Sequence, residues 1–369
     1  MKIFSKFVER RPELLKKLEF HASALKNLYF LTHLHAYQPR ANKKIFTKFE
    51  IDEKNLCPEV EERMEKIKNK NKLSFFDKAV ITSYVPLIHV AEKFPGALTI
   101  DFPQVTLDEI KNFYPKFYEK LIEMNKKDII EIAASSYHHA IPQMLSDEDI
   151  LYEYVYPLSM EQFDGEDVIT FHFPEQAINK AAFKALSNYA WKKDILITVI
   201  LDSMHHNPGS EIRAYTKYYE DKIRLGILFR NNFFSNWVAF SLADCLNYNS
   251  IEDSAIIMFE NLVNSIFVPY YYEKLKRGEE KLYFLLSVDA ETFGMHIKNS
   301  IEVLENFLSL VKLYMNLSTV RNYSFICNKI YPANILFDKS WSVDLCVWFI
   351  NETKSLREKI KEIRINLYD

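Results

Sequence analysis

Acidic side chains follow two apolar segments that lie far apart in the sequence. The segment 287–296, SVDAETFGMH, holds Asp289 and Glu291 beside one of only six glycines in 369 residues. The segment 170–177, TFHFPEQA, holds Glu175 in the same kind of position. Two carboxylates that face each other across a sugar can cleave a glycosidic bond, because one attacks or activates water while the other protonates the leaving oxygen. Glu175 and Asp289 are therefore the candidate catalytic pair.

Histidines gather in comparable positions. Eight of the ten lie within a few residues of the end of a predicted strand, namely His33, His35, His138, His139, His172, His205, His206 and His296. Asp202 and Arg230 also stand at predicted strand ends. Titratable side chains concentrated at one rim indicate a polar functional site.

Seven short apolar stretches rich in β-branched and aromatic residues predict the elements that position these side chains. They are 28–35, 97–102, 128–135, 167–173, 195–202, 224–230 and 281–289. Their near-continuous apolar character is typical of parallel strands that helices cover on both faces. Amphipathic helices are predicted between them, for example over 106–124, which opens with a capping-box pattern at Thr106, and over 179–191. Alternating strands and helices indicate an α/β fold.

The scarcity of glycine favours a barrel over a nucleotide-binding sheet among the possible α/β folds. Six glycines allow no glycine-rich phosphate-binding loop, so a nucleotide-binding sheet is not expected. We predict instead an incomplete seven-stranded (β/α)7 barrel over residues 1–298, with catalytic groups at the carboxyl ends of its strands. Residues 299–369 are predicted to form a C-terminal helical subdomain with helices over 300–317 and 339–367. The excursion 49–72 is expected to cover the mouth of the barrel.

Composition indicates a cytoplasmic protein with no nucleic-acid or membrane partner. The formal charge of −3 provides no basic surface for nucleic acid or anionic lipid. No apolar run approaches the roughly 18 residues that span a bilayer, and the N-terminus does not read as a signal peptide. The four cysteines, Cys57, Cys245, Cys327 and Cys346, form no CxxC pair and are expected to be reduced and partly buried, with two disulfides as the alternative.

Four motifs at predicted strand ends resemble those of glycoside hydrolase family 57, in the order of that family. They are HLHAYQPR (33–40), SSYHHAIPQML (135–145), HFPEQA (172–177) and DAETFGMH (289–296), and LFRNNFFSNWVAF (228–240) is similar to a further family stretch. The resemblance covers roughly residues 28–298. It implies an incomplete (β/α)7 barrel and a retaining enzyme of the α-amylase or 4-α-glucanotransferase type that acts on α-glucans without a cofactor or metal. Hydrolysis and sugar transfer both remain open.

The resemblance also implies roles for individual residues. Glu175 would be the nucleophile of a covalent glycosyl–enzyme intermediate, and Asp289 the acid/base. Glu291 would orient Asp289 or cap the following helix. Apart from the resemblance, the place of Trp237 just after a predicted strand makes it a candidate to stack on a sugar or to pack in the core. The candidate substrate-binding residues are His33, His35, Gln38, His138, His139, His172, Asp202, Arg230, Trp237, Glu291 and His296.

Two alternatives to this interpretation stay open, and three departures from the family pattern raise the first of them. His172 replaces a tryptophan, and Asn231 and Asn236 replace aspartates. The first alternative is a catalytically impaired, carbohydrate-binding homologue. The second is a metal-dependent carbohydrate hydrolase or deacetylase on a related barrel, in which His33 and His35 with Asp202 or His205 would bind the metal.

Overall fold

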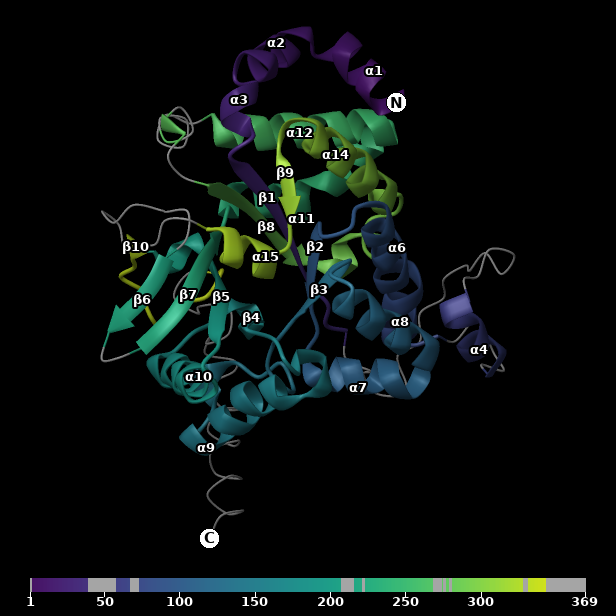
Figure 1. Ribbon diagram of the computed structural model, residues 1–369. Helices are drawn as coiled ribbons and strands as arrows, with labels where there is room; N and C mark the ends of the chain where they lie inside the picture. The colour runs from purple at the N-terminus through teal and green to yellow at the C-terminus, as the bar shows by residue number, and fades with distance from the viewer. Residues whose placement is uncertain are drawn as a thin grey trace.

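The computed structural model describes residues 2–38, 58–66, 73–206, 216–220, 223–267, 274, 277–278, 281–327 and 331–342 (Figure 1). Its strands are β1 (Leu28–His35), β2 (Leu98–Asp101), β3 (Ile130–Ala133), β4 (Val168–His172), β5 (Leu196–Asp202), β6 (Thr216–Glu220), β7 (Ile223–Arg230), β8 (Leu282–Asp289), β9 (Asn316–Ser318) and β10 (Tyr331–Pro332). All seven predicted strands are confirmed, as β1 to β5, β7 and β8. The short strands β6, β9 and β10 were not predicted.

The strands form two sheets that together make an open barrel. One sheet has the order β3-β2-β1-β8, with β9 also paired to β1, and the other has the order β10-β6-β7-β5-β4. All seven predicted strands pair in parallel, whereas β6 and β7 are antiparallel. The sheets meet at a parallel bridge between Ala134 and Phe171, and the backbone N–H of Asn231 donates to the Leu285 carbonyl at the opposite junction. The described strands therefore form an incomplete α/β barrel that is not closed.

Helices surround the strands. They are α1 (Lys2–Arg10), α2 (Pro12–Phe20), α3 (Ala22–Leu25), α4 (Pro58–Lys66), α5 (Phe75–Ala79), α6 (Val85–Lys93), α7 (Gln104–Phe113), α8 (Pro115–Lys126), α9 (Asp147–Ile150), α10 (Lys180–Lys193), α11 (Asn232–Tyr248), α12 (Ile251–Ile266), α14 (Ser300–Tyr314) and α15 (Val320–Ile326). Every residue of β2, β3 and β4 is buried, as expected for parallel strands covered on both faces. Figure 1 shows α12 and α14 on one side of the strands and α10 on another.

The predicted helix over 106–124 is two helices, and its predicted start is wrong. The chain enters α7 at Gln104, directly after Pro103, and Thr106 is a buried residue inside the helix that caps nothing. A break at Tyr114 separates α7 from α8, because Pro115 has no N–H for the helical ladder and disfavours helical backbone in the residue before it. The helix predicted over 179–191 is confirmed as α10, with Asn179 as its N-cap.

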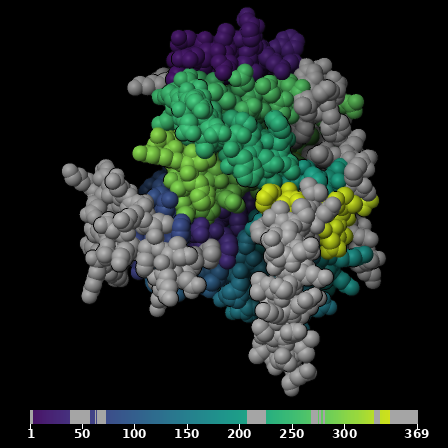
Figure 2. All heavy atoms as spheres, turned by 180° about the vertical axis from the view of Figure 1, so that it is seen from behind, coloured from purple at the N-terminus to yellow at the C-terminus, as the bar shows by residue number. Residues whose placement is uncertain are grey.

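The C-terminal part of the chain agrees only in part with its predicted helices. The helix over 300–317 is confirmed as α14, although strand β9 begins at Asn316. The helix expected from residue 339 does not start there, since residues 339–342 are not helical, and the remainder of that range lies outside the described residues. In Figure 2 the segment 333–342 (yellow) lies beside the green helical region, away from the purple N-terminal helices. A separate C-terminal subdomain stays a prediction.

Other expectations are tested only where the structure describes the chain. Of the excursion 49–72, only α4 is described. Cys245 and Cys327 are reduced and partly buried as expected, and Cys57 and Cys346 lie outside the described residues. Among the described helices, none has the length and apolar character needed to cross a lipid bilayer.

A π-helical turn over Val80–Tyr84 joins α5 to α6 and meets the loop that follows β8. Pro86 lacks the N–H that would bond the Thr82 carbonyl four residues earlier, which favours the wider turn. The Thr82 carbonyl lies against Gly294, where a Cβ atom would stand 1.8 Å from its oxygen. Gly294 has a φ of +90°, so both its backbone and its lack of a side chain allow this contact.

We predict that Gly294→Ala destabilises the protein by about 3 kcal/mol, because the new methyl group collides with the Thr82 carbonyl and the backbone is strained. Gly165→Ala is the matched control: its φ is +79°, but nothing lies within 4 Å of the added Cβ. The control is expected to cost about 1 kcal/mol. Denaturant unfolding of both variants measures the difference, and equal losses would refute the collision.

Candidate active site

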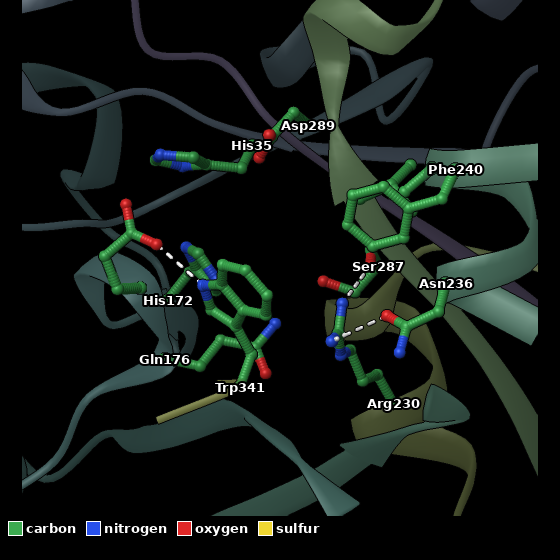
Figure 3. A pocket seen from close by; sticks show the side chains of 12 residues that line it. His35, His172, Gln176, Arg230, Asn236, Phe240, Ser287, Asp289 and Trp341 are labelled. Carbon is green, nitrogen blue, oxygen red and sulfur yellow. Dashed lines mark hydrogen bonds between the residues drawn. The ribbon is translucent and has the colours of Figure 1, made fainter. Parts of the chain in front are cut away.

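A cleft opens at the carboxyl ends of the strands, where the sequence predicts the functional site. It encloses about 600 Å³ of empty space, part of which is open to solvent. Figure 3 shows His35 and Asp289 on one side of it, with Gln176 and Trp341 and, farther along, Arg230 and Asn236 on the other. Its lining residues are His35, His172, Glu175, Gln176, Arg230, Asn236, Ala239, Phe240, Ser287, Val288, Asp289 and Trp341.

Glu175 is held in a tight turn directly after β4. Phe173 has the extended backbone expected before Pro174 (φ −81°, ψ 138°), and Glu175 and Gln176 then both have positive φ angles, 53° and 51°. Such backbone costs on the order of 1 kcal/mol or more per residue and persists where its surroundings enforce it. Here the Gln176 N–H donates to the Phe173 carbonyl at 2.8 Å, and a ring nitrogen of His205 lies 2.7 Å from the Gln176 carbonyl oxygen.

The Glu175 carboxyl group is partly buried and receives one hydrogen bond from an indole. Nε1–H of Trp341 donates to Oε2 at 2.7 Å. Burial raises the pKa of Glu175, and the Trp341 donor and the charge of His35 oppose this rise. The negative charge of Asp289, across the same cleft, adds to the rise. The Glu175 carboxylate is therefore partly desolvated, and the Trp341 hydrogen bond fixes its orientation.

Asp289 ends β8 with an exposed side chain that lines the cleft. Glu291, two residues later, is buried and does not line the cleft; its carboxyl group accepts a short hydrogen bond from the Tyr84 hydroxyl of the π-helical turn. Burial and the charge of Asp289 raise the pKa of Glu291 to about 7, against the effect of the Tyr84 hydrogen bond. Ser83 Oγ donates to the Ala290 carbonyl at 2.7 Å, so the same turn anchors both the side chain and the backbone behind Asp289.

Asp101, at the end of β2, lies behind the cleft at the centre of a histidine cluster. Its carboxylate is fully buried, with His33 Nε2 at 2.9 Å, His35 Nδ1 at 2.8 Å and His172 Nδ1 at 3.3 Å. His33, Asp101 and His172 each offer one potential metal-ligand atom to a common point. Asp101 was not predicted as a site residue, although it too lies at the end of a predicted strand.

His35 provides a positive charge at the edge of the cleft. Burial alone would lower the pKa of His35, but the charges of Asp101, Asp289 and Glu291 raise it to about 9. Burial and the charge of His35 hold the pKa of His139 well below its ordinary value. Charged His35 therefore donates from Nε2 to Nε2 of neutral His139 at 2.8 Å, and Tyr37 stacks on the His139 ring.

Arg230, at the end of β7, is fixed by a buried ion pair. Its Nε donates to Asp202 Oδ2 at 2.6 Å, its Nη1 to the Ser287 carbonyl at 3.0 Å and its Nη2 to Asn236 Oδ1 at 3.3 Å. Asp202 therefore orients Arg230 and does not line the cleft. Asn231, the other asparagine at a family aspartate position, caps α11 by accepting from the Phe234 N–H.

The structure brings five of the predicted site residues to the cleft: His35, His172, Glu175, Arg230 and Asp289. Eight others do not line it, namely His33, Gln38, His138, His139, Asp202, Trp237, Glu291 and His296. Of these, His138 is exposed and bonds Glu153, and Trp237 packs against the core.

Several lining residues were not predicted. Gln176 directly follows Glu175 and Ser287 lies two residues before Asp289, whereas no sequence pattern distinguishes Phe240 in α11. Trp341 fell within a predicted helix, and only the folding of the chain back onto Glu175 reveals its role.

Comparison with known proteins identifies the family. The sequence pattern of "Glycosyl hydrolase family 57" matches residues 10–336. No protein with curated annotation matches significantly. Similar solved structures include an exo-type maltose-forming amylase from Pyrococcus sp. ST04 (TM-score 0.61, 17% identity, covering 85% of this chain and 53% of that one). A branching enzyme from Thermococcus kodakaraensis gives a TM-score of 0.63 at 12% identity, covering 89% of this chain and 76% of that one.

A third similar structure is the 4-α-glucanotransferase of Thermococcus litoralis (TM-score 0.56, 15% identity, covering 85% of this chain and 40% of that one). This chain thus spans about half the length of the amylase and less of the glucanotransferase. At such low sequence identities the similar structures show only that the fold is shared. The family assignment is based on the sequence match, which extends over most of the chain. The chain belongs to glycosyl hydrolase family 57.

Proposed function

We propose that this protein is a retaining enzyme that cleaves α-glucans by hydrolysis or sugar transfer, with Glu175 as nucleophile and Asp289 as acid/base. The observation that carries the proposal is that these two carboxylates, from the ends of β4 and β8, line one cleft in different environments. Glu175 is partly buried and accepts from Trp341, whereas the Asp289 side chain is exposed to the cleft. Two carboxylates with distinct surroundings suit the two roles of a double displacement.

The proposed reaction has two steps. In the first, ionised Glu175 attacks the anomeric carbon while Asp289 protonates the glycosidic oxygen, so the bond to the leaving sugar breaks and a glycosyl ester forms. In the second, Asp289 takes a proton from water or from an acceptor hydroxyl, and that oxygen attacks the anomeric carbon and releases Glu175. The configuration at the anomeric carbon is therefore retained.

The remaining cleft residues suit a sugar substrate. His35, His172, Gln176, Arg230 and Asn236 present hydrogen-bonding groups, and Trp341 and Phe240 present aromatic surface. An α-glucan is proposed because the similar structures are described as a maltose-forming amylase, a 4-α-glucanotransferase and a branching enzyme. A catalytically impaired homologue, which the His172 departure keeps in view, would bind such sugars without turnover.

Glu175→Gln and Asp289→Asn are each expected to lower the turnover of maltooligosaccharides by about 10³-fold or more, because each removes one half of the double displacement. Reducing-end release measures the loss. Glu119→Gln, an exposed change on α8, is the matched control and should keep the parent rate.

Adding azide to Glu175→Ala and Asp289→Ala assigns the roles of the two carboxylates. The Glu175→Ala variant should yield a glycosyl azide of inverted configuration, and the Asp289→Ala variant should yield one of retained configuration. The opposite products would exchange the two assignments, and a parent protein without turnover would support the impaired homologue.

Trp341→Phe is expected to shift the acidic limb of the kcat/KM profile by about 1 pH unit to higher pH. The nucleophile must be ionised, and burial already raises the pKa of Glu175, so activity is lost as the pH falls through this raised value. Removing the Nε1–H donor takes a hydrogen bond from the ionised form and raises the pKa further. Trp191→Phe, an exposed change on α10, should leave the limb in place. An unshifted limb in Trp341→Phe would contradict the assigned donor.

Phe240→Ala is expected to raise KM for long maltooligosaccharides about fivefold with kcat little changed, because a stacking contact of about 1 kcal/mol is lost. Phe240 is 66% exposed and lines the cleft. Phe233→Ala on the same helix is the matched control, since Phe233 is 70% exposed but does not line the cleft. Equal effects of the two changes would rule out a sugar platform at Phe240.

A further inference from the structure

Three buried side chains from three strands converge at one point behind the cleft. His33 Nε2 from β1, Asp101 Oδ1 from β2 and His172 Nδ1 from β4 all lie within 4.8 Å of one another. His33 and Asp101 are 0% exposed and His172 is 3% exposed. Three potential ligand atoms in such a small, dry volume form a compact donor set.

These three atoms lack hydrogen bonds within the part of the chain that the structure describes. The distances of 2.9 Å from His33 Nε2 to Asp101 Oδ1 and 3.3 Å from His172 Nδ1 to the same oxygen are short enough, but the groups meet without the alignment that a hydrogen bond requires. Buried polar atoms without hydrogen bonds are costly and rare, so three such atoms at one point favour a ligand between them.

The opposite atoms of two of these side chains are hydrogen-bonded and keep the ligand atoms directed inward. His33 Nδ1 lies 2.7 Å from Ser287 Oγ, and in the tautomer in which Nδ1–H donates to this oxygen the Nε2 lone pair is available to a metal ion. Asp101 Oδ2 accepts from His35 Nδ1 at 2.8 Å, which leaves Oδ1 facing the two histidines. Hydrogen bonds of this kind, made by the far side of each ligand, are the usual support of metal-binding histidines and carboxylates.

We propose that His33, Asp101 and His172 bind one divalent transition-metal ion, with zinc as the expected occupant. Two imidazoles and one carboxylate suit zinc, whereas magnesium and calcium prefer all-oxygen ligands. A tetrahedral zinc ion with bonds of about 2.0–2.1 Å places neighbouring ligand atoms about 3.3 Å apart. The separations of 2.9 and 3.3 Å from Asp101 Oδ1 to the two nitrogens are close to this value, and the two nitrogens lie within 4.8 Å of each other.

The position of the site indicates what the ion does. His33 and Asp101 belong to the sheet of β1 and β2, and His172 belongs to the sheet of β4, which meets the first at the Ala134–Phe171 bridge. The ion therefore cross-links the two sheets. His172 also lines the cleft, so the ion lies directly behind the wall of the proposed sugar site. The inference does not rest on the proposed function, because neither Glu175 nor Asp289 is a ligand.

The test is metal analysis of the full chain after incubation with zinc sulfate and desalting. About one zinc ion per chain is expected in the unaltered protein. Asp101→Asn and His172→Gln should each lower zinc retention at least tenfold, whereas His89→Gln should retain it, since His89 lies on α6 away from the cluster. Zinc retention far below one ion per chain in the unaltered protein, or equal retention in all variants, would overturn the proposal.

Two measurements on the unaltered protein keep the test valid if the buried substitutions prevent folding. Cobalt added to chelator-treated protein should give the intense visible absorption of a four-coordinate ion, and zinc should displace it. The thermal midpoint should rise with zinc and return when a chelator is added, because the ion binds the folded state. A thermal midpoint and a cobalt spectrum that do not respond would overturn the site. None of these readouts uses sugar turnover, so failure of the proposed catalysis is recognised separately.

Discussion

The contacts of the buried Asp101 carboxylate with three histidines are the interactions on which the rest of the site depends. Burial raises the pKa of a carboxyl group, but here the charge of His35 and the nearby His172 and His33 hold it well below its ordinary value. A buried charge is tolerated only when it is compensated, so the positions of all three histidines are tied to Asp101. Because these histidines come from both sheets of the open barrel, the same carboxylate also couples the sheets.

The two proposed catalytic carboxylates are positioned by different means. Glu175 stands in a left-handed turn that the chain around β4 enforces, and Trp341 binds its carboxylate from a segment far along the sequence. Asp289 ends a long strand, and the loop after it is anchored by Tyr84 and by the contact between Gly294 and a carbonyl of the π-helical turn. Rigid support on both sides of a cleft is what a reaction that needs aligned groups requires.

The departures from the family pattern are accommodated by the structure. Asn231 caps α11, and Asn236 accepts from Arg230, whose charge Asp202 already balances. His172 occupies the wall of the cleft and at the same time completes the cluster around Asp101. The exchange of a tryptophan for a histidine at this position therefore has a structural partner and supports the metal site that we propose.

The sequence by itself determined the seven parallel strands, because their stretches are almost wholly apolar and β-branched, and it determined that the residues after them share one rim. It could not decide which side chains enter the cleft. Entry into the cleft depends on the side on which each side chain leaves its strand and on how the loops pack. For this reason Asp202 accepts a hydrogen bond from Arg230 and His138 bonds Glu153, and neither lines the cleft. Only the tertiary structure brought Trp341 to the site, because contacts between distant segments form only when the chain folds.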